Sequence, residues 1–269
     1  MASFVVTLAL AWWPTAWDLA VEWLTSRYGA HGACVALFAA YAVWERRAAL
    51  PSAEWRVRIP AGLALALAGA LLVVGHSEDS LTLRALSLPV AGLAVVLFGW
   101  GIRGARTLAF PLAFSLLAVP LPPVVISRLS AATQSLAASA AEQTLALWQV
   151  PVARDGLTFS IGQIDVDITE ACDGLPFLLA SVVVGIAAAW ALRMGPRQQI
   201  LVVVLAVVSG VAANLLRVAA TAVLAWVQPA AVIGTSHLLF GKLVYLVVGG
   251  AVAAFAVLVV RRAPARSSR

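Results

Sequence analysis

Long, continuous apolar runs dominate this chain and alternate with short stretches that carry most of its charges. Runs of this length without a period of two are typical of transmembrane helices. The first run contains Pro14, Asp18 and Glu22, but it lacks the basic start and small-residue cleavage site of a signal peptide, so we count it as a span. The pattern predicts eight spans, at residues 3–24, 29–45, 59–76, 86–102, 106–123, 173–192, 198–220 and 237–260.

Residues 124–150, between the fifth and sixth spans, are more polar and are rich in Ala, Ser, Gln and Leu. Apolar residues recur there at loosely helical spacing, at Ile126, Leu129, Leu136 and Leu145. This composition predicts a helix that lies along the outer face of the membrane instead of crossing it.

Residues 151–170 change character again and alternate in short stretches such as LTFSI and IDVDI. Pro151, Gly156 and Gly162 separate these stretches. Alternation bounded by turn residues predicts a hairpin-like extracytoplasmic cap, after which the chain enters the sixth span.

The composition excludes an ordinary soluble domain. Of 269 residues, 62% are hydrophobic and only 11% are charged. Lipid must therefore be the main solvent, and it permits only helices or closed barrels. We expect an all-α polytopic membrane protein in which residues 1–269 form one transmembrane domain. The net charge of +6 comes from clusters scattered between the spans, which indicates topology signals and not a nucleic-acid surface.

Basic residues collect in alternate loops, and this asymmetry predicts the orientation. The face that they mark contains only Glu45 and Glu54 as acids. We expect this face to be cytoplasmic, with both termini inside, in a multi-pass protein of the cytoplasmic (inner) membrane. Two thirds of the basic residues lie on this face, and the last four of them belong to the basic tail at 261–269. The full set is Arg46, Arg47, Arg56, Arg58, Arg103, Arg106, Arg193, Arg197, Arg261, Arg262, Arg266 and Arg269.

This topology brings three reactive side chains to one extracytoplasmic level. Cys172 precedes the sixth span, Arg217 lies near the outer end of the seventh, and His237 begins the eighth. A transporter, channel or anchor needs no thiol, guanidinium and imidazole at one depth, whereas a thiol protease or transpeptidase does. Cys172, Arg217 and His237 are therefore the candidate catalytic residues.

Each of these residues also has a simpler interpretation. Cys172 could be a small packed side chain or form a disulfide with Cys34, although a position just before a helix favours a thiolate. Arg217 could snorkel to lipid headgroups or pair with a carboxylate, and Asn214 on the same helix face favours a polar stripe that faces protein. His237 could be an interfacial polar group or a general acid or base.

Neighbouring residues suggest supporting roles and one alternative. Gly174 permits close approach of another chain segment, and Asp173 most simply caps the sixth span. A metal site made of His31, His76, His237 and a carboxylate is the alternative. Because no HExxH motif or paired-ligand spacing supports it, we expect no metal and no other cofactor.

From about Phe110 to Val259 the chain resembles the exosortase/archaeosortase family of polytopic membrane transpeptidases. The resemblance consists of a proline-rich span end (FPLAFSLLAVPLPP), a Cys-x-Gly-Leu element, an Asn-x-x-Arg element and a histidine that enters the last span. Residues 106–260 thus look like an exosortase core, whereas residues 1–105 match only in hydropathy. The matching residues are Cys172, Asp173, Gly174, Leu175, Asn214, Arg217, Ser236 and His237.

The resemblance implies a cysteine-dependent enzyme that recognises secreted proteins by a C-terminal sorting tail. Such a tail has a Pro-Glu-Pro type motif, a transmembrane helix and a basic cluster. The enzyme would cleave near the motif and pass the protein to an acceptor, often in bacteria that make extracellular polysaccharide. Expected partners are thus tailed secreted proteins, an acceptor and the lipid bilayer, without nucleic acid. The family usually has Ser or another small residue after the cysteine, so Asp173 is a departure that bears on the subtype and the tail motif.

The expected chemistry is thiol catalysis at the outer face. Cys172 would attack a peptide carbonyl to form a thioester, His237 would move the proton, and Arg217 would stabilise the oxyanion or orient the peptide. Two other classes stay open: a non-enzymatic transporter or polysaccharide-export assembly factor, and a metal-dependent intramembrane hydrolase. A substrate helix would dock where glycines permit close contact, at Gly185, Gly210, Gly249 and Gly250.

Overall fold

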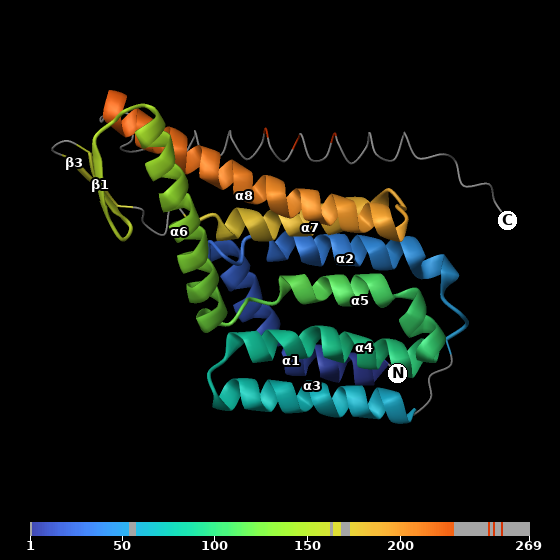
Figure 1. Cartoon of the computed structure of the whole chain (residues 1–269). Helices are drawn as coiled ribbons and strands as arrows, with labels where there is room; N and C mark the ends of the chain where they lie inside the picture. The colour runs from blue at the N-terminus through green and yellow to red at the C-terminus, as the bar shows by residue number, and fades with distance from the viewer. Residues whose placement is uncertain are drawn as a thin grey trace, which may run out of the picture. The chain divides into compact units, whose positions relative to one another are not determined.

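The computed structural model describes residues 2–53, 58–161, 164–167 and 173–228, together with residues 247, 250 and 254 (Figure 1). Cys172, Ser236, His237 and most of the predicted span at 237–260 lie outside the described residues. The chain is predominantly helical, which agrees with the predicted all-α membrane protein. It forms two compact units, Met1–Pro122 and Pro123–Arg269.

The first unit is built from helices whose positions follow the predicted spans closely at 3–24, 29–45 and 59–76. Within the unit, α3 packs along α4, α1 lies against α4, and α2 lies against α5 (Figure 1). In chain order the helices are α1 (Ala2–Thr25), α2 (Gly32–Arg46), η1 (Arg47–Ala49), α3 (Ile59–Ser77), α4 (Leu81–Thr107), α5 (Ala109–Ser115) and η2 (Leu116–Ala118).

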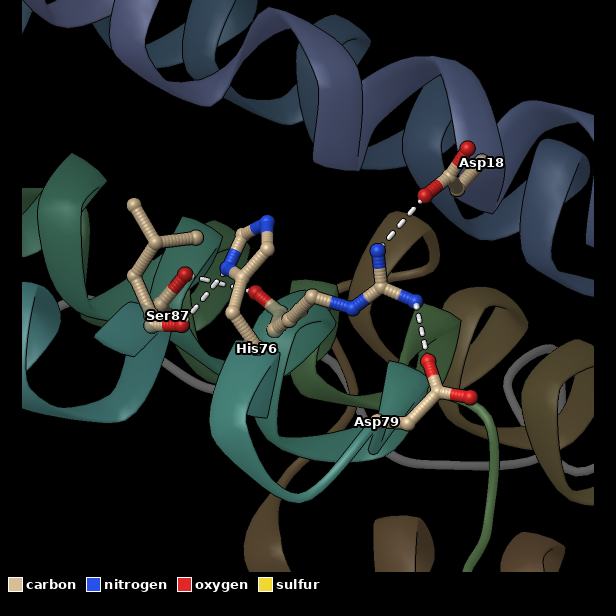
Figure 2. Close-up of polar contacts among 6 residues, drawn as sticks. Asp18, His76, Asp79 and Ser87 are labelled. Carbon is tan, nitrogen blue, oxygen red and sulfur yellow. Dashed lines mark hydrogen bonds and ion pairs between the residues drawn. The ribbon is translucent and has the colours of Figure 1, made fainter. Parts of the chain in front are cut away.

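Helix α4 begins before the predicted start of its span at 86 and includes the charged residue Arg84. Arg84 Nη1 donates to Asp18 Oδ2 of α1 at 2.7 Å, and Arg84 Nη2 lies 3.9 Å from Asp79 Oδ1 (Figure 2). In the same group, Ser87 Oγ donates to the backbone carbonyl of Arg84 (Figure 2). A helix can therefore continue through this charge because carboxylates within the unit neutralise it. Asp18, which interrupts the first apolar run, is one of these partners.

Near its other end, α4 contains a backbone break at Gly101, with φ 63° and ψ −161°. Side chains with a Cβ rarely adopt this conformation. The break changes the helical hydrogen bonding of the preceding turn, where Arg58 Nη1 donates to the carbonyls of Leu97 at 3.1 Å and Phe98 at 2.7 Å. Arg58, a topology marker in the sequence, thus also caps a broken helix.

The predicted span at 106–123 is not one continuous helix. Helices α5 and η2 end at Ala118, and the chain is non-helical until α6 begins at Pro123. Prolines at 120, 122 and 123 explain the break, because proline has no amide hydrogen and disfavours helical backbone in the residue before it. The apolar run continues through this break, which is why hydropathy alone predicted a full span.

The second unit combines three helices and a small sheet within its described residues. Helices α7 and α8 pack side by side, and α6 packs against α8 (Figure 1). Both α7 and α8 lie close to the predicted spans at 173–192 and 198–220, with α8 longer than expected. The elements are α6 (Pro123–Leu147), β1 (Val152–Asp155), β2 (Thr158–Ile161), β3 (Ile164–Asp167), α7 (Leu175–Ala191) and α8 (Pro196–Val227).

The segment predicted to form a hairpin contains a three-stranded antiparallel sheet in the order β1-β2-β3. Gly156, at φ 61°, lies in the tight turn between β1 and β2, as a residue without a Cβ readily does. Phe159 of β2 is buried in a core with Ala138 of α6 and Val218 of α8. The sheet therefore packs against the helices of its own unit, and its place outside the membrane stays a prediction.

In the described part of the chain, three helices are long and apolar enough to cross a membrane: Ile59–Ser77, Leu81–Thr107 and Pro196–Leu224. A fourth candidate is the broken pair Ala109–Ala118 and Pro123–Leu147 taken together. Helix Leu175–Ala191 is apolar but shorter. The structure thus supports a helical membrane protein with three or four recognisable spans, whereas the predicted number of eight stays a prediction.

Candidate active site

Asp173, the residue after Cys172, lies at the start of α7 and is fully buried. Its Oδ1 accepts the backbone amide of Leu175, the first residue of α7, at 3.2 Å. Asp173 thus contacts the start of α7, but the N-cap residue is Gly174, which has no side-chain cap, so Asp173 does not take the predicted N-cap position. Its Oδ2 accepts the hydroxyl of Ser130 on α6 at 2.5 Å. Burying a carboxylate is unfavourable unless its oxygens find donors, and each oxygen of Asp173 has one here.

Ser130 is itself part of a buried polar pair on α6. Gln134, one turn later on the same face, donates from Nε2 to Ser130 Oγ at 3.1 Å. Both side chains are buried. The hydrogen bonds therefore run from Gln134 through Ser130 to the carboxylate of Asp173.

Arg217 lies toward the C-terminal end of α8 and is only 7% exposed. Its Nη2 donates to Asn214 Oδ1 at 3.0 Å, and its Cζ lies 5.8 Å from the centre of the Phe177 ring on α7. Burial against protein groups rules out the snorkelling interpretation for this arginine. The polar stripe of Asn214 and Arg217 faces protein, as the sequence predicted.

Gly174 brings the two groups together, because α7 begins in direct contact with α8 at this residue. A Cβ at Gly174 would lie 2.6 Å from Asn214 Cγ and 2.7 Å from Asn214 Nδ2, closer than packed atoms tolerate. Only glycine allows this approach, which the sequence predicted in general terms. Asp173, Gly174, Asn214 and Arg217 thus form one buried group within the second unit, called the Asp173–Arg217 cluster below.

Two members of this site, Ser130 and Gln134, were missed by sequence reasoning. The prediction for 124–150 was a helix along the membrane surface and assigned no buried face; Leu129 and Leu136 are exposed, whereas Leu145 is buried. The buried face of α6 is instead lined by small and polar residues at helical spacing: Ser130, Gln134, Ala137, Ala138, Ala141 and Leu145. The signal that could have found it is a polar pair four residues apart within a face of alanines.

The transmembrane exosortase family matches residues 23–254, which is most of the chain. This chain belongs to that family. No curated protein and no solved structure matches it. The match to exosortases begins at residue 23, so the likeness includes most of the region before 106 that resembled the family in hydropathy alone.

Membership of the exosortases supports a membrane transpeptidase-type function and does not favour the non-enzymatic alternative. The Asp173–Arg217 cluster suits such chemistry. Arg217 is a permanently charged planar donor, and its orientation is constrained by Asn214. A cation held rigidly in a buried site can stabilise a developing oxyanion without reorganising during the reaction.

Two of the four glycines expected to admit a substrate helix have a different role in this exosortase, whereas a Cβ at Gly250 would meet nothing within 4 Å. A Cβ at Gly185 of α7 would lie 2.9 Å from Ala206 Cβ, and one at Gly210 of α8 would lie 3.0 Å from Ser181 Oγ. Both glycines therefore serve the packing of α7 against α8, which corrects that part of the docking prediction. Gly249 lies outside the described residues.

Two of the three histidines named in the metal alternative contact backbone carbonyls in the first unit, and the third, His237, lies outside the described residues. His31 Nε2 lies 3.1 Å from the carbonyl of Leu117, and His76 Nδ1 lies 2.8 Å from that of Leu72. Among the described residues no group of three or more His, Cys, Asp or Glu could hold a metal. Cys34 is an exposed free thiol on α2, whereas Cys172 lies outside the described residues, so the alternative of a disulfide between them stays open.

Proposed function

We propose that this exosortase is a cysteine transpeptidase or peptidase of the cytoplasmic membrane that cleaves C-terminal sorting tails from secreted proteins. The observation that carries the proposal is the buried Arg217, whose partner Asn214 packs against Gly174. Gly174 is two residues from Cys172 along the chain, and this short separation supports the proposal that the candidate nucleophile acts near Arg217. A buried guanidinium close to a cysteine is suited to thiolate chemistry.

The proposed reaction has two stages. The Cys172 thiolate attacks the carbonyl carbon of the scissile peptide, a C–S bond forms, and the C–N bond breaks as the tail leaves as an amine. His237 supplies the proton to that amine, and Arg217 binds the oxyanion of the tetrahedral intermediate. Water or an acceptor nucleophile then gives its proton to His237 and attacks the thioester carbonyl, a new C–O or C–N bond forms, the C–S bond breaks, and the thiolate is restored.

The substrate is proposed from the same family likeness. It would carry a motif of the Pro-Glu-Pro type at the outer face, a transmembrane helix and a basic cluster on the cytoplasmic side. The charge asymmetry that orients the enzyme would orient this tail in the same way. The motif would thereby reach the face on which Cys172, Arg217 and His237 are expected.

The decisive experiment follows a tailed substrate in cells that express the full chain or its Cys172→Ala and Cys172→Ser variants. Unprocessed precursor is expected to accumulate with both variants, because neither replacement supplies a thiolate. A Cys34→Ala variant, which removes the exposed thiol of α2, is the matched control and is expected to process normally. Normal processing by Cys172→Ala would instead indicate a transporter or assembly factor.

The same assay tests the role of Arg217. Arg217→Lys keeps the charge but loses the planar set of donors, so we expect a loss of processing rate of about a hundredfold. Protein level and thermal stability in detergent report whether the variant folds. A folded Arg217→Lys protein with the wild-type rate would reduce Arg217 to a structural residue.

A further inference from the structure

We propose that Ser130 of α6 is a positioning residue of this enzyme. Its hydroxyl, oriented by Gln134, fixes Asp173 and with it the backbone that carries Cys172. This inference rests on the proposed function of Cys172. It brings into the site a helix that the sequence placed along the outer membrane surface without a role in the chemistry.

The direction of the hydrogen bonds supports this role. Ser130 Oγ has one hydrogen to donate and accepts one from Gln134 Nε2 at 3.1 Å. Accepting from Gln134 leaves the serine hydrogen for Asp173 Oδ2, at 2.5 Å. Gln134 thus sets the orientation of the hydroxyl, and Ser130 sets the position of the carboxylate.

The segment after Cys172 is held from two helices. On one side Ser130 of α6 donates to Asp173. On the other side Gly174 packs against Asn214 of α8, where no Cβ would fit. Two contacts on consecutive residues restrict both translation and rotation of this backbone, whereas one contact would leave it free to pivot. Placement of a nucleophile to within a fraction of an ångström is what efficient attack requires.

The composition of α6 argues against a role in packing alone. Further along its buried face, packing is provided by alanines and by Leu145. Ser130 and Gln134 are the buried polar side chains among the described residues of this helix, and they occur at the turn that meets Asp173. Burying a hydroxyl and an amide is less favourable than burying alanine, so packing gives no reason for them at that turn.

The test uses the full chain, purified and reconstituted with a tailed substrate. Ser130→Ala is expected to lower kcat by about tenfold to a hundredfold with little change in KM, because Cys172 is displaced while substrate binding persists. Ser130→Thr keeps the hydroxyl and is expected to recover most of the rate. The matched control is Ser127→Ala, an exposed serine one turn earlier on α6. A kcat for Ser130→Ala equal to that of Ser127→Ala would overturn the proposal.

A second readout does not depend on cleavage. In a Cys34→Ala background Cys172 is the sole thiol, since the chain has two cysteines. We expect Ser130→Ala to change the rate at which N-ethylmaleimide alkylates Cys172 by about threefold or more. In Ser130→Thr, which keeps the hydroxyl, the alkylation rate is expected to return to that of the enzyme with Ser130. Equal rates in Ser130→Ala and Ser127→Ala would refute the positioning role. If the wild-type enzyme does not cleave the tailed substrate, the proposed function is wrong. The alkylation rates still test whether Ser130 positions the segment that carries Cys172.

Discussion

At the scale of residues, the second unit buries an aspartate, an asparagine and an arginine close together in a chain that is otherwise strongly apolar. Such groups are unfavourable inside a protein unless each finds partners, and the described structure provides donors to Asp173 and an acceptor to Arg217. Polar groups kept inside a membrane protein at this expense mark a functional site more often than a structural one.

The contact between Gly174 and Asn214 leads to a prediction at this scale. Gly174→Ala would place a Cβ 2.6 Å from Asn214 Cγ, so α7 or Asn214 must shift. Overpacking of this kind costs about 1–3 kcal/mol, and we expect a lower melting temperature in detergent together with slower processing. Gly62→Ala is the matched control, because nothing lies within 4 Å of the Cβ it would add. Equal melting temperatures of the two variants would show that the start of α7 can move away from α8.

At the scale of elements, the helices place large apolar residues outward and small ones between helices. In α6, Leu129 and Leu136 are exposed while Ala137 and Ala141 are buried. In the pair of α7 and α8, Gly185 and Gly210 lie at the contact. This arrangement is expected where lipid surrounds the helices, because lipid attracts leucine as well as the protein interior does and close packing needs small residues.

The broken helix α4 provides the prediction at the scale of elements. Gly101 has φ 63° and ψ −161°, a region that residues with a Cβ occupy at a cost of about 1–3 kcal/mol. We therefore expect Gly101→Ala to lower the unfolding temperature measured in detergent. Gly92→Ala on the same helix is the control, since its added Cβ would meet only Leu112 Cδ2, at an ordinary 3.8 Å. If Gly101→Ala unfolds at the same temperature as Gly92→Ala, the break in α4 is not needed.

At the scale of the whole molecule, the orientation in the membrane decides which compartment the site faces. The clusters of arginine predict that the loop before α3 is cytoplasmic and that the turn between α3 and α4 lies outside. Ser52 and Glu78 are exposed residues of these two connections. In the proposed function the enzyme cleaves the tail motif on the extracytoplasmic side. The orientation of the enzyme must therefore put its site on the same side of the membrane as that motif.

Cysteine labelling tests this orientation. In a chain without Cys34 and Cys172, Glu78→Cys is expected to react with a membrane-impermeant maleimide in intact cells. Ser52→Cys is expected to react only after the cells are permeabilised, and it serves as the control for the opposite face. The reverse pattern would put both termini outside and would exclude a reaction at the extracytoplasmic face.

The hydropathy pattern alone predicted α1, α2, α3, α7 and α8 closely, because apolar length is a local property that each segment carries by itself. It failed at 106–123, where prolines end the helix within an apolar run, and at Arg84, whose charge is neutralised by Asp18 from another helix. The family motifs named Asp173, Gly174, Asn214 and Arg217, and the structure brings these four residues together.

The sequence by itself thus determined a helical membrane protein and its family, and it named the candidate residues for the proposed chemistry. The tertiary structure alone decided which further polar residues contact these candidates. Ser130 and Gln134 belong to no motif and lie on a helix for which the sequence predicted no buried face. Their role arises because helix packing brings α6 to Asp173, a contact between residues 43 positions apart, and no local pattern encodes a contact at that separation.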